Sequence, residues 1–269
     1  MDTTTKLFQR SRGEAASRAA DFASPNPTVP ENLGALVLTV DLSTALGPVE
    51  VNRPSMTFLR SQRVVAFDNS HWVTRYYDML RNLLRDACEG QPYTIAVTSP
   101  TAGCGATVSA VNLALSFARM PGASVLLVDA NIRFPAMARL FGLPSLTRRR
   151  ADNEMVPDML TTLEFGNIRT HFLRPCWDDM NMTPASALQR LKTQVEYARQ
   201  CLKPSVVILD VAPMLETDET VPLVLDADCV VMVLAADGTK LSDVEVCQTL
   251  LGSRTNVQFV LNKSGKHGL

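Results

Sequence analysis

Along most of its length, the chain alternates short apolar runs with longer segments in which apolar residues recur every three or four positions. Short runs of this kind indicate buried strands, and the longer segments indicate amphipathic helices. The predicted strands are 63–67, 93–99, 123–130, 205–210, 227–237 and 257–263. The predicted helices are 70–88, 106–120, 135–142, 184–202 and 240–252.

Residues at the helix ends support these assignments. Ser70 is predicted to cap the first helix, and Pro121 stops the second. Pro135 suits a first helical turn, and Gly142 suits the end of the same helix. Because strands alternate with helices, we predict an α/β fold with a mainly parallel sheet, right-handed crossovers and helices on both faces.

Residues 1–62 do not follow this pattern. Residues 23–32, with the sequence ASPNPTVPEN, are rich in proline, which disfavours regular structure. Residues 5–20 are predicted as a short helix, and residues 33–43 as either a strand or a docking segment. We therefore predict a low-order N-terminal arm over 1–62, or alternatively an arm that packs on a partner, and one folded domain over 63–269.

The composition narrows the class of protein. Hydrophobic residues make up 46% and charged residues 20% of the chain, as in globular proteins. The net charge of -1 produces no overall electrostatic field that would attract nucleic acid or a membrane. The run Arg148–Arg150 is predicted to be a solvated loop. The six cysteines have no Cys-x-x-Cys spacing, so neither a zinc site nor a disulfide framework is expected. The chain lacks an apolar run of roughly 18 residues and a secretory h-region, so we expect neither a membrane span nor a secretory signal.

Three of the predicted strands end in residues suited to phosphate chemistry. The strand 93–99 leads into a Gly-x-Gly turn, and the strands around Asp129 and Asp210 each end in an aspartate. In parallel sheets, ligands bind beyond the carboxyl ends of the strands. An aspartate in this position often faces the magnesium ion of a phosphate enzyme. Two such strands beside a Gly-x-Gly turn indicate a phosphate site more strongly than one such strand does.

The segment TSPTAGCGAT, residues 98–107, predicts an anion site built from the backbone. Gly103 and Gly105 allow a tight turn with inward-pointing amides, and the following helix directs the positive end of its dipole to the same point. Thr107 stands where a hydroxyl would bind magnesium. Phosphate-binding loops normally carry a lysine before that residue, and Ala106 stands there instead. Taken alone, the segment is also compatible with a glycine turn into an ordinary core helix.

The order of these motifs resembles the bacterial tyrosine kinases of capsule and exopolysaccharide export. These kinases belong to the superfamily that also contains the partitioning and septum-placing ATPases. The similarity spans residues 63–263 and rests on five segments: DNSHWVTRYYDMLRNLL, TSPTAGCGATVSAVNLALSFA, VLLVDANIRFPAMARLFGLP, VVILDVAPML and VLNK. They resemble the helix before the first strand, the Walker A, A-prime and B motifs, and the closing strand. The resemblance implies a P-loop NTPase-like kinase domain of the deviant Walker A superfamily over 63–269.

The resemblance also implies roles for individual residues. Asp129 would be the A-prime aspartate that assists proton removal from the substrate tyrosine, and Asp210 the Walker B aspartate oriented toward magnesium or its water. The implied cofactor is ATP or ADP with magnesium, and the implied metal ligands are Thr107, Asp129 and Asp210. The residues implied to contact the nucleotide are Gly103, Cys104, Gly105, Thr107, Val108, Arg133 and Asn262.

The sequence departs from the family pattern at several positions. Ala106 replaces the Walker A lysine, and Asn131 replaces a second A-prime aspartate. In the family, the helix that contacts the neighbouring subunit carries Glu, Arg and Arg at three-residue steps. The matching positions here are Arg75, Asp78 and Arg81. The family's C-terminal tyrosine cluster is absent, since the last tyrosine is Tyr197.

These features lead to one expected function and two alternatives. We expect a tyrosine-kinase-like protein of exopolysaccharide or capsule biosynthesis and export, weakened or inactive in phosphoryl transfer because of Ala106. The first alternative is an active tyrosine autokinase or ATPase that uses another cation, for which the candidates are Arg133, Lys240 and Lys263. The second is a partitioning-type ATPase, which is disfavoured because residues 99–105 contain no lysine.

The resemblance finally implies partners and a place in the cell. The implied partner is a membrane polysaccharide co-polymerase or chain-length regulator, with the arm as the contact segment. A homo-oligomer is also implied, and no nucleic acid is expected. The implied location is cytoplasmic, at the inner face of the cell membrane through that partner.

Overall fold

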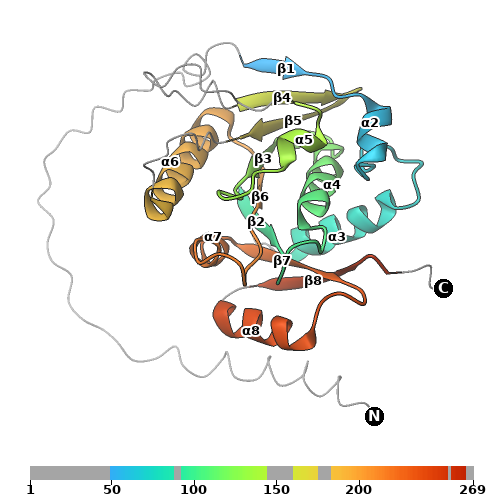
Figure 1. Cartoon of the computed structure of the whole chain (residues 1–269). Helices are drawn as coiled ribbons and strands as arrows, with labels where there is room; N and C mark the ends of the chain where they lie inside the picture. The colour runs from blue at the N-terminus through green and yellow to red at the C-terminus, as the bar shows by residue number, and fades with distance from the viewer. Residues whose placement is uncertain (1–48, 88–91, 144–159, 175–182, 254–255, 265–269) are drawn as a thin grey trace, which may run out of the picture. The chain divides into compact units, whose positions relative to one another are not determined.

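An eight-stranded sheet forms the centre of the structure, in the order β1-β4-β5-β3-β6-β2-β7-β8 (Figure 1). The computed structural model describes residues 49–87, 92–143, 160–174, 183–253 and 256–264. The strands are β1 (Glu50–Asn52), β2 (Tyr93–Thr98), β3 (Val125–Asp129), β4 (Leu160–Phe165), β5 (Ile168–Leu173), β6 (Val206–Asp210), β7 (Cys229–Ala235) and β8 (Val257–Asn262). Among the described pairs of neighbouring strands, all are parallel except β4 and β5, so the prediction of a mainly parallel sheet is confirmed.

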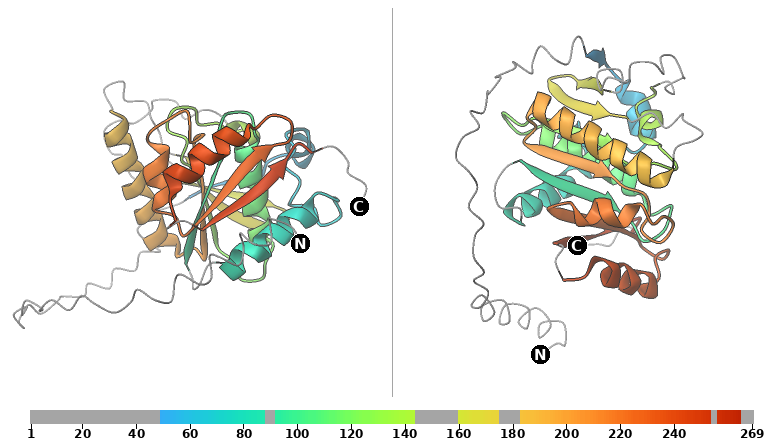
Figure 2. Two further views of the ribbon diagram at one scale, coloured as in Figure 1. Left: turned by 90° about the horizontal axis from the view of Figure 1, so that it is seen from below. Right: turned by 90° about the vertical axis from the view of Figure 1, so that its left-hand side faces the viewer.

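Helices cover both faces of this sheet (Figure 2). They are α2 (Met56–Ser61), α3 (Thr74–Ala87), α4 (Ala106–Ala118), α5 (Met137–Leu140), α6 (Pro184–Leu202), α7 (Thr220–Leu225) and α8 (Leu241–Leu251). None of the helices in the described ranges is long and apolar enough to cross a bilayer.

Alternate side chains of each central strand enter two separate hydrophobic cores, as the period of a β-strand requires. In β6, for example, Val206 and Ile208 pack in one core, and Val207 and Leu209 pack in the other. The first core is closed by α2, α3, α4 and α5, and the second by α6, α7 and α8. The continuously apolar strands are therefore explained by burial on both faces.

The β4–β5 hairpin is an element that the sequence prediction missed. Phe165 pairs with Ile168, so only Gly166 and Asn167 lie between the strands, and Gly166 has a φ of 66°. A Gly-Asn pair between two β-rich runs is a hairpin signal. The polar residues within these strands, Thr161, Thr162, Glu164, Arg169, Thr170 and His171, hid the hairpin, because the prediction relied on continuous apolar runs.

The predicted strand 63–67 is wrong. These residues form a buried turn, in which the amides of Val65 and Ala66 donate to Oδ1 of Asn112 at 2.8 and 2.9 Å. The Asn112 amide nitrogen donates to the carbonyls of Arg63 and Val108 at 3.0 and 2.9 Å. The backbone groups that a strand would use are thus satisfied by one side chain of α4.

Two predicted helix starts are also wrong. α3 begins at Thr74, and Ser70 does not cap it, because its hydroxyl and amide donate to Asp68 Oδ1 at 2.7 and 2.9 Å. α5 begins at Met137, so Pro135 lies before the helix and outside its first turn. The remaining predicted helices and strands coincide with observed elements to within a few residues.

The predicted boundary of the arm at residue 62 lies too late in the chain. Glu50–Asn52 pair with β4, and Leu59 of α2 is fully buried in the first core. Ser55 caps α2, because its hydroxyl oxygen accepts a hydrogen bond from the Phe58 amide at 3.4 Å. The predictions for residues 1–48 and for Arg148–Arg150 fall outside the described residues.

The Asn112 contacts give a prediction about stability. Replacing Asn112 with Ala leaves the buried Val65 and Ala66 amides without an acceptor, which should lower the free energy of unfolding by about 2–4 kcal/mol. Asn82→Ala, at an exposed position of α3, is the matched control and should change it by less than about 0.5 kcal/mol. Urea denaturation of both variants measures the difference, and equal effects would contradict the assigned role.

Candidate functional site

The ends of the three strands that carry the predicted site lie side by side. β6 lies between β3 and β2 in the sheet. Asp210 of β6 is in register with Asp129 of β3 and with Val97 of β2. The segments that follow these three strands therefore leave the sheet at neighbouring points of one edge, as the sequence predicts.

The loop between β2 and α4 has the backbone of an anion site. Gly103 and Gly105 have φ angles of 81° and 94°, in the left-handed region that favours glycine. Gly105 is the N-cap of α4, and no side chain caps the helix there. The first amides of α4 therefore have no side-chain acceptor at the N-cap, and the helix dipole favours an anion in that position.

Asn262, at the end of β8, fixes the shape of this loop. Its amide nitrogen donates to the Cys104 carbonyl at 2.8 Å. A Cβ atom at Gly105 would lie 2.3 Å from that nitrogen, so residue 105 must be glycine in this arrangement. Cys104 is buried, with its sulfur 3.5 Å from the hydroxyl of Thr239, a residue between β7 and α8. The predicted contact of Asn262 with a nucleotide base stays a prediction.

The two aspartates are buried and incompletely bonded. Asp129 is 1% exposed and Asp210 2% exposed. The Met137 amide donates to Asp129 Oδ2 at 3.0 Å. Oδ1 of Asp129 and Oδ2 of Asp210 have no hydrogen-bond partner. Buried polar atoms are almost always bonded, so two such oxygens on adjacent strands point to a missing ligand.

Burial raises the pKa of both aspartates, and the charge of Asp129 adds to the shift of Asp210. Burial raises the pKa of Asp129 to about 6, against the backbone amides that stabilise its charged form. Burial and then the charge of Asp129 raise the pKa of Asp210 well above its usual range, although a hydrogen bond from Thr107 opposes the shift. Two carboxylates in this setting bind protons or cations more strongly than exposed ones do.

The residues present fit a hydrated magnesium ion that also binds phosphate. Magnesium prefers oxygen ligands, retains several waters, and usually takes one or two carboxylates together with phosphate oxygens. The free oxygens of Asp129 and Asp210, with the hydroxyl of Thr107 close to Asp210, supply such ligands. Within the described ranges, no group of three or more His, Cys, Asp or Glu residues could hold a metal ion.

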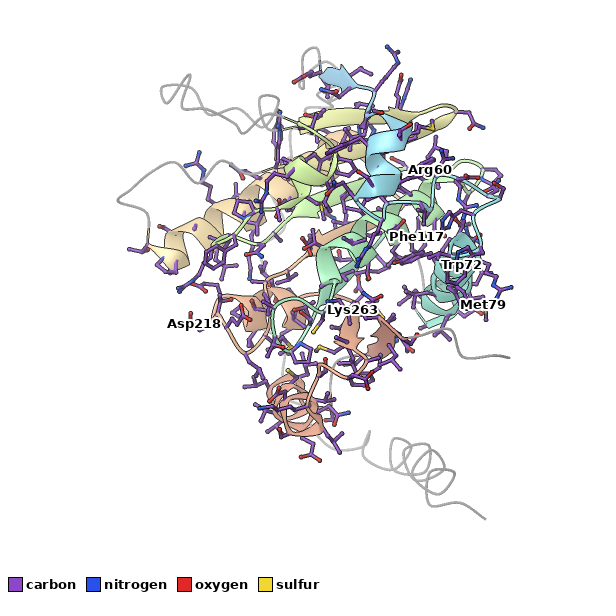
Figure 3. The ribbon with its side chains drawn as sticks, turned by 45° about the vertical axis from the view of Figure 1, so that its right-hand side comes forward. Arg60, Trp72, Met79, Phe117, Asp218 and Lys263 are labelled. Carbon is purple, nitrogen blue, oxygen red and sulfur yellow. The ribbon has the colours of Figure 1, made fainter. Side chains whose placement is uncertain are left out.

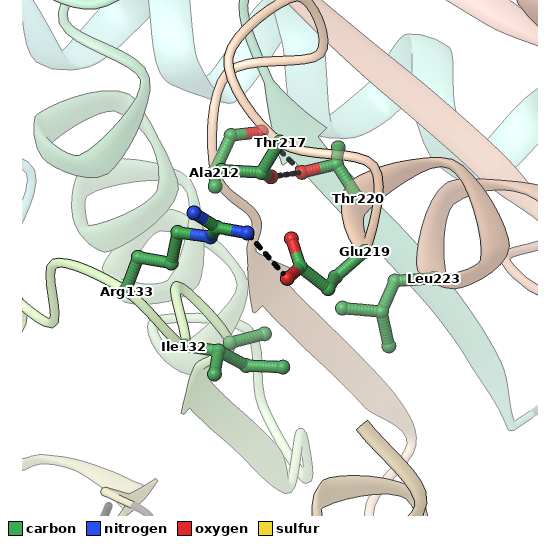
Figure 4. A pocket seen from close by; sticks show the side chains of 8 residues that line it. Ile132, Arg133, Ala212, Thr217, Glu219, Thr220 and Leu223 are labelled. Carbon is green, nitrogen blue, oxygen red and sulfur yellow. Dashed lines mark hydrogen bonds and ion pairs between the residues drawn. The ribbon is translucent and has the colours of Figure 1, made fainter. Parts of the chain in front are cut away.

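Arg133, predicted to contact the nucleotide, binds an acidic residue in this structure. Its guanidinium donates to Glu219 at 2.8 Å (Figure 4) and lies 3.8 Å from Asp218. The ion pair holds the pKa of Glu219 below its usual range. The surrounding pocket has a volume of about 10 Å³, roughly the space of one water. Arg133 would have to leave Glu219 to reach a phosphate, and its predicted role stays a prediction.

Two of the three α3 positions compared with the family pattern, Asp78 and Arg81, bind α4 and the residue that ends it. Asp78 accepts from the Ser116 hydroxyl at 2.5 Å, from Arg81 at 3.1 Å and from Arg119. Arg81 also donates to the Ser116 carbonyl at 2.9 Å. Arg75 instead lies over the ring of Tyr76. Asp78 and Arg81 therefore stabilise the contact between two helices of the same chain.

Sequence reasoning missed two acidic residues beside the site. Glu216 accepts from the Ala102 amide of the loop at 2.5 Å, and Glu219 binds Arg133. Both lie between β6 and α7, in a segment without the periodicity of a helix or strand. Their position directly after the predicted Walker B strand was the available signal.

The pKa shifts give a prediction about stability in the absence of metal. Because the folded-state pKa values of both aspartates are raised, their ionised forms destabilise the fold, and this penalty grows as pH rises from about 4 through 6. Asp210→Asn should therefore raise the free energy of unfolding by about 1–3 kcal/mol at pH 7.5 with chelator present. The gain should largely disappear at about pH 4. Urea denaturation at both pH values measures it, and a gain that is independent of pH would contradict this account.

Comparisons with known proteins identify similar folds. No protein-family model matches the chain, and no curated protein matches it in sequence. The kinase domain of the Escherichia coli tyrosine kinase ETK is 20% identical with a TM-score of 0.64, over 81% of this chain and 89% of that one. The chimerical protein CapA2B2 is 19% identical with a TM-score of 0.63, over 84% and 99% of the two chains.

A plasmid partition protein from Borrelia burgdorferi is also similar. It is 15% identical with a TM-score of 0.51, over 66% of this chain and 83% of that one. At these identities, the likeness establishes the fold. The chain thus has the P-loop NTPase-like fold that bacterial tyrosine kinase domains and partition ATPases share.

Proposed function

We propose that this chain is a tyrosine-kinase-like P-loop protein that binds ATP or ADP with magnesium and is weakened or inactive in phosphoryl transfer. One observation carries the proposal. The two unbonded oxygens of Asp129 and Asp210 lie at the strand ends next to an uncapped anion loop, and the helix that follows the loop begins with Ala106. This arrangement favours binding of an anion and a cation together, and lacks the side chain that normally stabilises the transferred phosphoryl group.

Individual residues have distinct parts in this proposal. The backbone amides around Gly103 and Gly105 hold the phosphates, and Thr107 with the two aspartates holds magnesium. A bound magnesium ion would neutralise part of the phosphate charge. Asp129, whose Oδ1 has no hydrogen-bond partner, would be the carboxylate that accepts the proton of a tyrosine hydroxyl.

The missing lysine weakens catalysis more than binding. Removal of one well-placed charged donor costs roughly 3–5 kcal/mol of transition-state stabilisation, by analogy with oxyanion-hole donors. That energy corresponds to about a hundred- to several-thousand-fold in rate. Backbone amides and magnesium still bind the ground state, so we expect nucleotide binding that is weak and turnover that is slow or absent.

We further propose that the chain acts in exopolysaccharide or capsule assembly, at the cytoplasmic face of the membrane. Its partner there would be a membrane polysaccharide co-polymerase or chain-length regulator. Two findings support this: the fold shared with tyrosine kinase domains, and the order of the motifs along the chain.

An apolar surface on α3 and on the turn before it supports self-assembly. Four apolar side chains spaced by four, three and four residues are half-exposed or more. These residues are Trp72 (60% exposed), Tyr76 (50%), Met79 (67%) and Leu83 (51%). Trp72 and Met79 project from the same side of the molecule in Figure 3. We assign this α3 stripe to contact with a second copy of the chain, because apolar patches of this kind mark interfaces.

Two contacts favour a second candidate function, an active autokinase with a substitute cation. Lys240 follows Thr239, which contacts Cys104, and Lys263 follows Asn262, which binds the carbonyl of Cys104. Two lysines therefore flank the loop on its β7–β8 side.

The proposed effect of Ala106 gives a prediction about catalysis. Ala106→Lys should raise the rate of phosphoryl transfer to tyrosine about a hundred- to several-thousand-fold, with a smaller gain in ATP affinity. Ala106→Met has a similar length without the charge, and should change neither quantity appreciably. Single-turnover assays with ATP and magnesium, read by phosphotyrosine mass spectrometry, measure the rate, and calorimetry measures the affinity.

The same assays distinguish the alternatives. If neither the wild-type protein nor Ala106→Lys binds ATP or ADP, the nucleotide-binding proposal is wrong and a structural role remains. If the wild-type protein phosphorylates tyrosine at the rate of Ala106→Lys, the substitute-cation candidate is correct. Loss of that activity in Lys263→Ala or Lys240→Ala would then identify the cation.

The α3 stripe gives a prediction about assembly. The double variant Met79→Ser, Leu83→Ser should have a lower weight-average mass than the wild-type protein at high concentration, because the apolar contact area is lost. Phe259→Ser, which changes a residue of β8 that is 43% exposed, is the control and should assemble like the wild-type protein. Sedimentation equilibrium measures the masses, and identical masses for all three proteins would exclude the stripe as the contact.

A further inference from the structure

The segment after β6 is bound along the phosphate loop. Residues 211–216 run beside residues 97–102 and are joined to them by three backbone hydrogen bonds. These bonds run from the amides of Val211, Met214 and Leu215 to the carbonyls of Val97, Ser99 and Pro100, at 2.9, 2.8 and 3.1 Å. The bonds fix the position from which the next side chain, Glu216, leaves the backbone.

Glu216 places a carboxylate against the loop. Its Oε1 accepts from the Ala102 amide at 2.5 Å. Ala102 directly precedes Gly103, the first of the two glycines with positive φ, and both Ala102 and Glu216 are exposed to solvent. A protein anion is therefore bound to a backbone amide at the mouth of the loop that would hold the phosphates.

We propose that Glu216 is a specificity residue that disfavours the more highly charged nucleotide, so that the loop binds ADP in preference to ATP. The inference rests on the proposed nucleotide site. A negative charge at the mouth of the loop repels each further phosphate charge, and Ala106 supplies no ammonium group to offset it. The effect is moderate because the carboxylate is exposed, and it is screened by salt.

The chain offers a test that separates charge from shape. Glu216→Gln keeps the length of the side chain and an oxygen that can accept from Ala102, so the loop should retain its conformation. Asp218→Asn is the matched control, because Asp218 (labelled in Figure 3) lies two residues further on with a side chain 93% exposed, and its ion pair is with Arg133. Both variants remove one negative charge from the same segment.

The experiment is calorimetric titration of ATP and of ADP into wild-type protein, Glu216→Gln and Asp218→Asn, each also with Ala106→Lys. We expect Glu216→Gln to raise the affinity for ATP about three- to tenfold and the affinity for ADP by a smaller factor. Asp218→Asn should change either affinity by less than about twofold. The gain should shrink at about 1 M salt, where the screening length is about 3 Å.

Each result decides the inference. Equal ATP affinity in Glu216→Gln and Asp218→Asn, or an equal gain for ATP and ADP, overturns it while the nucleotide site stands. Absence of nucleotide binding in every variant overturns both this inference and the proposed nucleotide site. Binding that appears only when Glu216 is replaced by Gln supports the inference and shows that Glu216, in addition to Ala106, keeps nucleotides out of the loop.

Discussion

The candidate site is built around two carboxylates that are buried side by side at the ends of adjacent strands. Asp129 and Asp210 are in register on β3 and β6, and each has an oxygen without a hydrogen-bond partner. Burial of a charge without a partner costs free energy, so buried carboxylates bind protons or cations more strongly than exposed ones do. The loop with Gly103 and Gly105 lies at the end of the next strand. Carboxylates that favour a cation therefore lie beside backbone amides that favour an anion.

The sequence predicted this edge of the sheet well, for a physical reason. Strands buried on both faces are continuously apolar, so the aspartates that end β3 and β6 stand out against them. The prediction missed strands that contain several polar residues, as in the β4–β5 hairpin. Residues 63–67 look like a strand in sequence, but the amides of Val65 and Ala66 bind Asn112, which is 47 and 46 residues away, and no local pattern contains that contact. Glu216 was missed for the same reason, because its position depends on backbone bonds between distant segments.

One helix, α4, connects most of these features. Its first residue follows Gly105 of the loop, its middle holds the 63–66 turn through Asn112, and Ser116 near its end binds Asp78 and Arg81. Buried polar contacts of this kind specify one arrangement, because each lost partner leaves an unsatisfied group. The position of the loop is thus set by contacts along the whole helix as well as by the sheet edge.

The polar contacts between α3 and α4 have a mechanical consequence. The face of α3 that binds Ser116 is bonded to the far end of the helix that begins at the loop, while its other side carries the apolar stripe. A protein bound to that stripe would therefore be separated from the loop by α4 alone, and would press on the helix that carries the loop without touching the loop itself.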